Sequence, residues 1–133
     1  MERQTRQKLA VMHAIEHSGR SLNPTEIWAA AQHDVPQINL STVYRQLKAL
    51  QDEGQVVRVD LAGQAARFEA QCRSAHAKKQ THHHHHFHCT GCERVFPIHA
   101  CPGAMDGLAP PGFRVLHHDL TLHGLCADCG TQP

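Results

Sequence analysis

The first half of the chain carries apolar residues at helical spacing, interrupted by short polar breaks. Residues 6–17 place Leu9, Met12 and Ile15, together with Val11, on one face of a helix, and a Ser-Gly pair ends it. This pattern predicts a first helix whose apolar face packs inward.

A second, shorter helix is predicted from its capping residues. Asn23 can accept hydrogen bonds from the free amides of a first turn, Pro24 suits the first helical position, and Glu26 stands three residues after the cap. The apolar face of this helix would consist of Ile27, Trp28 and Ala31.

A third helix is predicted to reach about residue 53. Either Asn39 or Ser41 can cap its first turn, because both side chains can accept from backbone amides. Its inward face would consist of Val43, Leu47 and Leu50.

Two strands, at residues 55–59 and 65–70, follow the third helix and are joined by a turn at 62–63. Helix, helix, turn, helix and hairpin is the order of a winged helix-turn-helix, which binds double-stranded DNA. Hydroxyl, aromatic and basic side chains on the outward face of the third helix and on the hairpin suit phosphates and base edges. The candidate DNA contacts are Thr42, Tyr44, Arg45, Lys48 and Arg58, with Arg67 as a second wing residue. An ordinary solvated helix face has a similar composition, so this prediction rests on the place of the helix before a hairpin.

The second half has fewer apolar positions and one strongly alternating segment. Residues 94–98 predict a short strand, 102–111 a brief helix or loop, and 113–125 a longer strand. In the longer strand His118 shares the apolar, protected face with Leu116 and the following alternate leucines. His118 is then either a buried histidine held by a hydrogen bond or a metal ligand.

Length and charge bound the organisation of the chain. Its 133 residues allow at most two small domains, and 13 Lys+Arg against 12 Asp+Glu do not by themselves indicate a nucleic-acid partner. No apolar run approaches the roughly 20 residues that span a bilayer. The two halves differ in character, which predicts an α+β chain with a winged-helix domain at 1–72, a polar linker at 73–81 and a ligand-rich domain at 82–133.

Two cysteine pairs of identical spacing dominate the second half: Cys89-x-x-Cys92 and Cys126-x-x-Cys129. Cysteines two residues apart can bind one ion from a single turn of backbone, so two such pairs supply a closed tetrahedral zinc site. Disulfides are disfavoured because each pair is too close for an internal bridge and no apolar signal segment is present, which predicts a reducing cytoplasm. The five histidines at 82–86 are surplus to this site and suggest a second kind of metal site.

A set of motifs spans nearly the whole chain. It comprises Asn23-Pro24-Thr25-Glu26-Ile27-Trp28, Leu40-Ser41-Thr42-Val43-Tyr44-Arg45, the histidine run, both cysteine pairs and His118-x7-Cys126. Together these motifs resemble the ferric uptake regulator family, and most closely its zinc uptake regulators. The resemblance implies a homodimeric, metal-sensing repressor of uptake genes that binds operator DNA, with a C-terminal dimerisation domain. It implies no enzymatic activity, no small-molecule substrate and no membrane partner.

The resemblance also implies three metal sites. It assigns Cys89, Cys92, Cys126 and Cys129 to a structural zinc, in agreement with their spacing. A sensory site at the hinge between domains would use Asp60, Cys72, His84 and His86, with Glu69 as an alternative oxygen ligand. A third site would use His83, His85, Cys101 and His118, where Cys101 stands at a position that is usually acidic. We therefore expect one structural zinc and one or two regulatory zinc ions per chain.

The choice of zinc follows from the donor atoms. Cys72 adds a thiolate to imidazoles, a donor set that suits zinc, whereas oxygen-rich sites suit iron or manganese. Ser21 stands where iron-type members tend to have a histidine, and the histidine run lacks the aspartate of peroxide-sensing members. A metal at the hinge would order the dimer for an inverted-repeat operator. The alternatives are an iron- or manganese-responsive regulator of the same family, and a metal-buffering protein that does not bind DNA.

Overall fold

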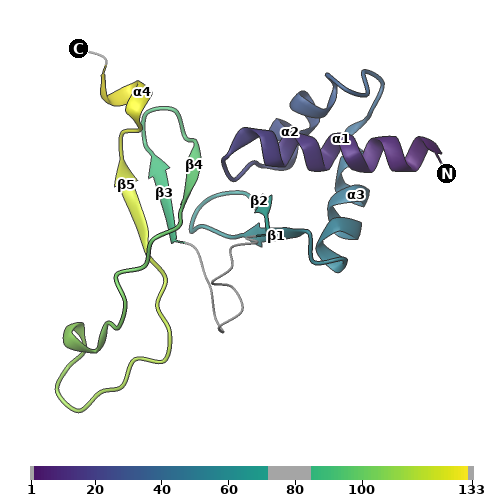
Figure 1. Ribbon diagram of the computed structural model, residues 1–133. Coiled ribbons are helices and arrows are strands. Elements are labelled where there is room, and N and C mark those ends of the chain that lie inside the picture. The colour runs from purple at the N-terminus through teal and green to yellow at the C-terminus, as the bar shows by residue number, and fades with distance from the viewer. Residues whose placement is uncertain (1, 72–84, 132–133) are drawn as a thin grey trace. The chain divides into compact units, whose positions relative to one another are not determined.

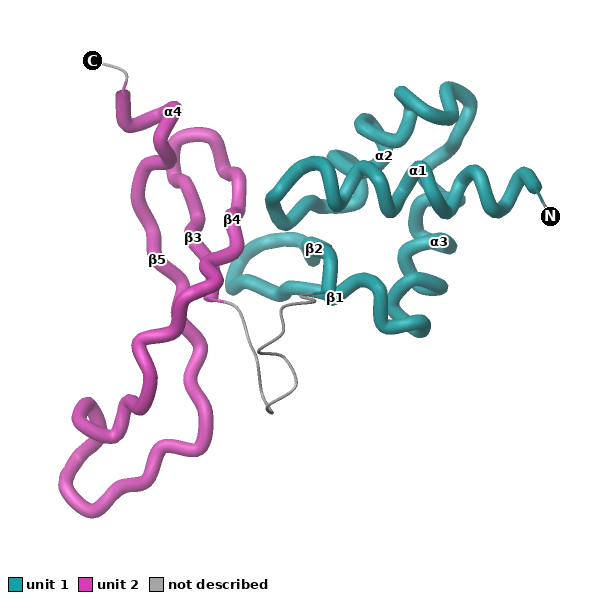
Figure 2. Tube along the Cα trace, in the orientation of Figure 1, with its two compact units in different colours: residues 1–77 teal, residues 78–133 magenta. Residues whose placement is uncertain are grey.

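The structure, a computed structural model, describes residues 2–71 and 85–131. The chain divides into two compact units, unit 1 at residues 1–77 and unit 2 at residues 78–133 (Figure 2). The predicted linker at 73–81 lies outside the described residues. None of the helices in the described ranges is long and apolar enough to cross a membrane.

Unit 1 contains three helices followed by a two-stranded hairpin (Figure 1). The helices are α1 (Glu2–Ser18), α2 (Pro24–Ala31) and α3 (Leu40–Asp52), and the antiparallel strands are β1 (Val56–Val59) and β2 (Arg67–Ala70). Leu22, between α1 and α2, adds an isolated antiparallel bridge to Phe68 of β2. The predicted order of helices and strands, and the α+β class, are therefore confirmed.

The starts of α2 and α3 follow from their capping residues. The Asn23 side chain accepts from the Glu26 amide at 2.8 Å, and the Glu26 carboxylate accepts from the Asn23 amide at 2.9 Å. This reciprocal capping box satisfies two amides that the helix itself cannot pair. At α3 the cap is Asn39, which accepts from the Thr42 amide at 2.8 Å, whereas Ser41 lies inside the helix.

The core of unit 1 lies between the three helices and β2. Its fully or nearly buried side chains are Ala10, Val11, Ala14, Ile15, Leu22, Ile27, Ala31, Ile38, Val43, Leu47, Leu50, Val56 and Phe68. Leu9, predicted to face inward, is 62% exposed, and α1 begins earlier than residue 6. The buried face of α1 includes Ala10 and Ala14 in place of Leu9, because small side chains allow α1 to pack closely against α2 and α3.

Unit 2 is built on a three-stranded sheet of order β4-β3-β5. Strand β3 (His85–Cys89) pairs antiparallel with β4 (Val95–Ile98) and parallel with β5 (Thr121–Gly124), and a single turn of helix, α4 (Ala127–Gly130), follows (Figure 1). The predicted strand at 94–98 is confirmed, and the segment 102–111 contains only the short 3-10 helix η2 (Asp106–Leu108). Pro97 is compatible with β4 because β4 is an edge strand.

The predicted strand at 113–125 is wrong over most of its length, since only Thr121–Gly124 forms a strand. Two of the three leucines predicted to face inward are exposed in the single chain, Leu116 by 86% and Leu122 by 53%, whereas Leu120 is half-buried. Alternation of apolar residues makes a strand only where a second strand pairs with the backbone. Strand β3 supplies that partner only opposite residues 121–124.

Candidate functional site

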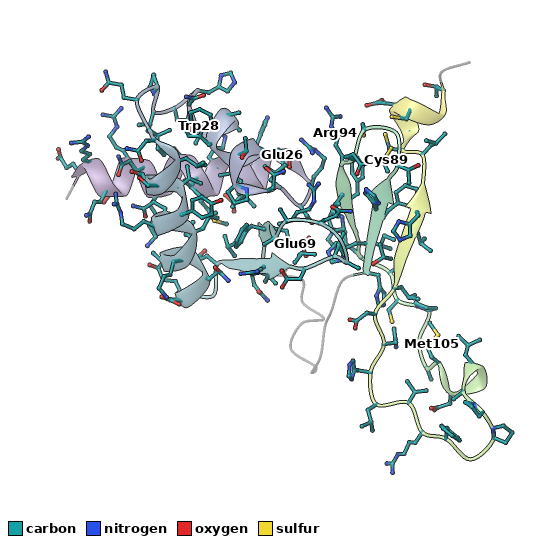
Figure 3. The ribbon with its side chains drawn as sticks, turned by 180° about the vertical axis from the view of Figure 1, so that it is seen from behind. Glu26, Trp28, Glu69, Cys89, Arg94 and Met105 are labelled. Carbon is teal, nitrogen blue, oxygen red and sulfur yellow. The ribbon has the colours of Figure 1, made fainter. Side chains whose placement is uncertain are left out.

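The four cysteines of the two pairs converge in unit 2. Cys89 ends β3, and the turn that follows it returns to β4 through a bond from the Cys89 amide to the Arg94 carbonyl at 2.9 Å (Figure 3). Cys92 lies in this turn, and Cys126 and Cys129 belong to the α4 turn, in which the Gly130 amide donates to the Cys126 carbonyl at 2.7 Å. The sulfur atoms of the four cysteines all lie within 4.8 Å of one another.

The spacing of these sulfurs fits a tetrahedral zinc ion. Cys92 Sγ and Cys126 Sγ are 3.9 Å apart, close to the edge of about 3.8 Å expected for four zinc–sulfur bonds of about 2.3 Å. Gly91 keeps the turn close to the second pair, because a Cβ at this residue would lie 3.1 Å from Cys129 Sγ. None of these four cysteines forms a disulfide, so no disulfide competes with metal binding in the cluster.

Hydrogen bonding shifts the pKa values of two cysteines in this cluster in opposite directions. The backbone amide of Cys126, 3.3 Å from Cys89 Sγ, and then the amide of Cys92 lower the pKa of Cys89 to about 6. Hydrogen bonds to the sulfurs of Cys89 and Cys126 raise the pKa of Cys129 to about 12. The pKa values of Cys89 and Cys129 are thus shifted in opposite directions, and a cation that binds all four sulfurs must displace the protons that the cluster holds.

A second cluster joins three of the four residues predicted for the third site. His85, Cys101 and His118 place one donor atom each within 4.8 Å of one another. Cys101 Sγ lies 3.2 Å from His118 Nε2, and the rings of His85 and His118 stack with centroids 4.9 Å apart. The Leu120 amide donates to His85 Nδ1 at 3.2 Å, so a metal bound to that nitrogen would replace this hydrogen bond. His83 lies outside the described residues.

The residues predicted for the sensory site belong to both units, and Cys72 and His84 lie outside the described residues. His86 is in β3 and is buried. Asp60 follows β1 and accepts from Arg58 Nε at 2.9 Å. The alternative ligand Glu69 is buried in unit 1, where it accepts from Ser21 Oγ at 2.6 Å.

The outward face of α3 carries most, but not all, of the predicted DNA contacts. Tyr44 is 55% exposed, and Arg45 and Lys48 are also exposed. Thr42 departs from the prediction, because it is buried and its Oγ1 accepts from Arg45 Nη2 at 3.3 Å. The buried face of α3 is wider than the predicted apolar stripe and includes this first-turn threonine.

The hairpin keeps one of its two predicted basic wing residues. Arg58 of β1 is exposed, whereas Arg67 of β2 is buried. Arg67 Nη1 lies 3.1 Å from Glu26 Oε1 and 3.2 Å from the Ser21 carbonyl oxygen. Arg67 therefore ties β2 to the start of α2. The capping role of Glu26 was predicted from the sequence, but its ion pair with Arg67 left no signal in the local sequence pattern.

A unit with winged-helix order and a unit with two clusters of metal-binding side chains define a metal-dependent DNA-binding regulator. The model of the ferric uptake regulator family matches residues 2–123, so the chain belongs to this family. It is therefore a metal-responsive transcriptional regulator, not an enzyme, and the regulators of this family dimerise and bind DNA.

Individual relatives bear different names within the family. The peroxide-responsive repressor PerR of Staphylococcus saprophyticus is 28% identical over 128 residues, which cover 94% of this chain and 80% of the relative. A zinc-bound manganese uptake regulator has a TM-score of 0.71 at 24% identity, over 90% of this chain and 87% of that one. A zinc uptake regulator complexed with zinc and DNA has a TM-score of 0.57 at 25% identity, over 93% and 81%.

Proposed function

We propose that this protein is a zinc-responsive repressor of zinc uptake genes, acting in the cytoplasm as a homodimer on inverted-repeat operator DNA. Zinc would bind to the four cysteines as a permanent structural ion and to one or two further sites as the regulatory signal. The observation that carries the choice of zinc is the donor chemistry of the described clusters. Both contain cysteine sulfur, and neither contains a carboxylate.

Sulfur and imidazole donors favour zinc over iron and manganese, which prefer more oxygen ligands. In the cluster of His85, Cys101 and His118, the Cys101 thiol stands at a position that the family resemblance makes acidic, and a thiol there shifts the preference further toward zinc. In unit 1 the buried carboxylate of Glu69 already accepts a short hydrogen bond from Ser21. Removing Glu69 from this bond to serve as an oxygen ligand would cost the pairing of a buried hydroxyl.

The sensory site remains the one proposed from the sequence. Asp60 and Cys72 stand before the linker along the chain, whereas His84 and His86 follow it. An ion that took ligands from both groups would favour those dimer conformations in which the two winged helices match an operator. By linkage, operator DNA would then strengthen zinc binding by the same factor as zinc strengthens DNA binding.

The DNA-binding part of the proposal rests on the exposed side chains of unit 1. Arg45 and Lys48 on α3, together with Arg58 on the hairpin, supply positive charge for phosphates or guanine. Tyr44 supplies an exposed ring with a hydroxyl. These residues have no place in a protein that only buffers metal.

The experiment that tests this proposal is a selection of genomic DNA fragments by the purified protein. Binding is carried out in parallel with zinc, with manganese, with ferrous iron under anaerobic conditions and with a chelator, and recovered fragments are sequenced. We expect zinc to enrich inverted repeats upstream of metal transporter genes. Equal enrichment with the chelator would refute metal control, and enrichment only with iron or manganese would refute the choice of zinc.

A further inference from the structure

We propose that unit 2 contains an additional zinc-binding site formed by His88 of β3 and His123 of β5, with Glu93 as the carboxylate that orients His88. This site is separate from the four cysteines and from the cluster around Cys101. It would bind a zinc-class divalent cation more weakly than the cysteines, because two imidazoles leave the remaining coordination positions to water.

The sheet brings the two histidines together. His88 and His123 are direct neighbours in the parallel register of β3 and β5, so their side chains emerge on the same face. His88 Nδ1 and His123 Nδ1 lie 3.2 Å apart, and the two rings are nearly perpendicular at 88°. Two zinc–nitrogen bonds of about 2.0 to 2.1 Å in tetrahedral geometry require a nitrogen–nitrogen distance of about 3.3 Å. The two Nδ1 atoms thus already lie at nearly the distance expected of a chelating pair.

Glu93 determines which nitrogen of His88 is available. Its Oε2 lies 2.8 Å from His88 Nε2, and a carboxylate can only accept a hydrogen bond, so Nε2 must carry the proton. The lone pair of neutral His88 is consequently on Nδ1, the nitrogen that faces His123. A histidine whose second nitrogen donates to a carboxylate is the usual arrangement of a metal-binding histidine, and the carboxylate raises its basicity.

The backbone at Glu93 indicates that this carboxylate has a role beyond a turn. Glu93 has a φ of 65°, a conformation that favours glycine and is costly for other residues. Glycine would satisfy the turn with less strain, yet it would leave His88 without a partner for Nε2.

Access to the site is one-sided. The side chain of His88 is only 11% exposed, whereas His123 is exposed. An ion would therefore be held between a largely buried, oriented histidine and an exposed one, with solvent on its open side. Because β5 leads into Cys126, binding here would also fasten the strand that carries the second cysteine pair to β3.

The test uses the full-length dimer with one zinc per chain already bound, titrated with further Zn²⁺ and followed by ¹H–¹⁵N spectra of the histidine side chains. We expect the Nδ1 signals of His88 and His123 to shift together while the Nε2 proton of His88 is retained. The zinc stoichiometry should fall by one per chain in His123→Ala, and it should be unchanged in His117→Ala, which removes another exposed histidine of the same segment.

A second variant separates zinc binding from folding. Glu93→Gly removes the orienting carboxylate while relieving the positive φ, so the protein should remain folded. Its affinity for this additional zinc should fall by roughly 10- to 100-fold, the usual effect of losing an outer-shell partner. Unchanged Nδ1 signals on addition of zinc would show that the two histidines share only a proton and would overturn the proposal. An equal loss of zinc in His117→Ala would overturn it as well.

Discussion

Replacement of one of the four clustered cysteines, in Cys126→Ser, should unfold unit 2 while leaving unit 1 folded. The substitution removes one of four sulfurs that lie within 4.8 Å of one another, and the other three cannot close a tetrahedral thiolate site. It also changes the residue whose amide donates to Cys89 Sγ, although the amide itself remains.

The expected size of this effect follows from the small core of unit 2. Among its described residues, Cys89 and Val95 are the buried apolar side chains, and burial of a valine contributes only about 1.5 to 3 kcal/mol. Ordering the backbone costs about 1 to 2 kcal/mol for each residue, so this burial cannot hold the sheet together. Structural zinc contributes on the order of 10 kcal/mol in zinc-finger peptides, which is the scale that unit 2 requires. Unit 1, by contrast, has a continuous apolar core that includes Ile27 and Leu47.

The assay is a pair of ¹H–¹⁵N backbone spectra together with a measurement of dimer content by sedimentation. Cys126→Ser should lose the dispersed signals of unit 2 and dissociate, and its unit 1 signals should persist. Cys101→Ser is the matched control, because Cys101 is exposed and lies outside the four-cysteine cluster. A Cys126→Ser protein that kept a folded unit 2 after chelation would refute the structural role of the zinc.

Three further predictions concern proton release, DNA contact and helix capping. Because hydrogen bonds to the sulfurs of Cys89 and Cys126 raise the pKa of Cys129 to about 12, the cluster should still hold a proton near pH 7 to 8 and should release it when zinc binds. Zinc retention should therefore weaken as the pH falls. Calorimetry in buffers of different ionisation enthalpy should find at least one proton released for each zinc bound. Finding no released proton would contradict a protonated thiol in the metal-free cluster. Arg45→Ala should weaken operator binding by about 1 to 3 kcal/mol in fluorescence anisotropy if Arg45 contacts a base, with unchanged zinc content, and unaltered affinity would remove Arg45 from the interface. Asn23→Ala should lower the stability of unit 1 to urea by about 1 kcal/mol through loss of the capping box, and a denaturation midpoint equal to that of the parent protein would argue against it.

The parts of the fold that the sequence predicted well are those set by local chemistry. The start of α2 depends on Asn23 and Glu26, three residues apart, and both bonds of the capping box form as expected. The two cysteine pairs likewise need only their own turns to present sulfurs in the same direction. The third helix was recognisable because Val43 and Leu47 mark its buried face.

The errors concern features that depend on distant partners. Leu9 was expected inside, yet close packing of α1 favours its alanines. Thr42 was expected at the surface, and the rest of unit 1 covers it. Most of the strand expected at 113–125 does not form, because β3 is its only pairing partner among the described strands and is short. The pairing of His88 with His123 could be recognised only once the parallel register of β3 and β5 was known.

The most direct test of the central claim is operator binding measured against free zinc concentration. The full-length protein, with its structural zinc in place, is added to a fluorescent inverted-repeat fragment recovered from the genomic selection, and free zinc is set by a metal buffer. The proposal predicts that the anisotropy rises with free zinc. Without regulatory zinc, the affinity for the operator should be at least 5-fold weaker, in line with the usual coupling of about 1 to 3 kcal/mol. Manganese at the same free concentration should not replace zinc. Equal operator affinity with and without regulatory zinc would contradict it.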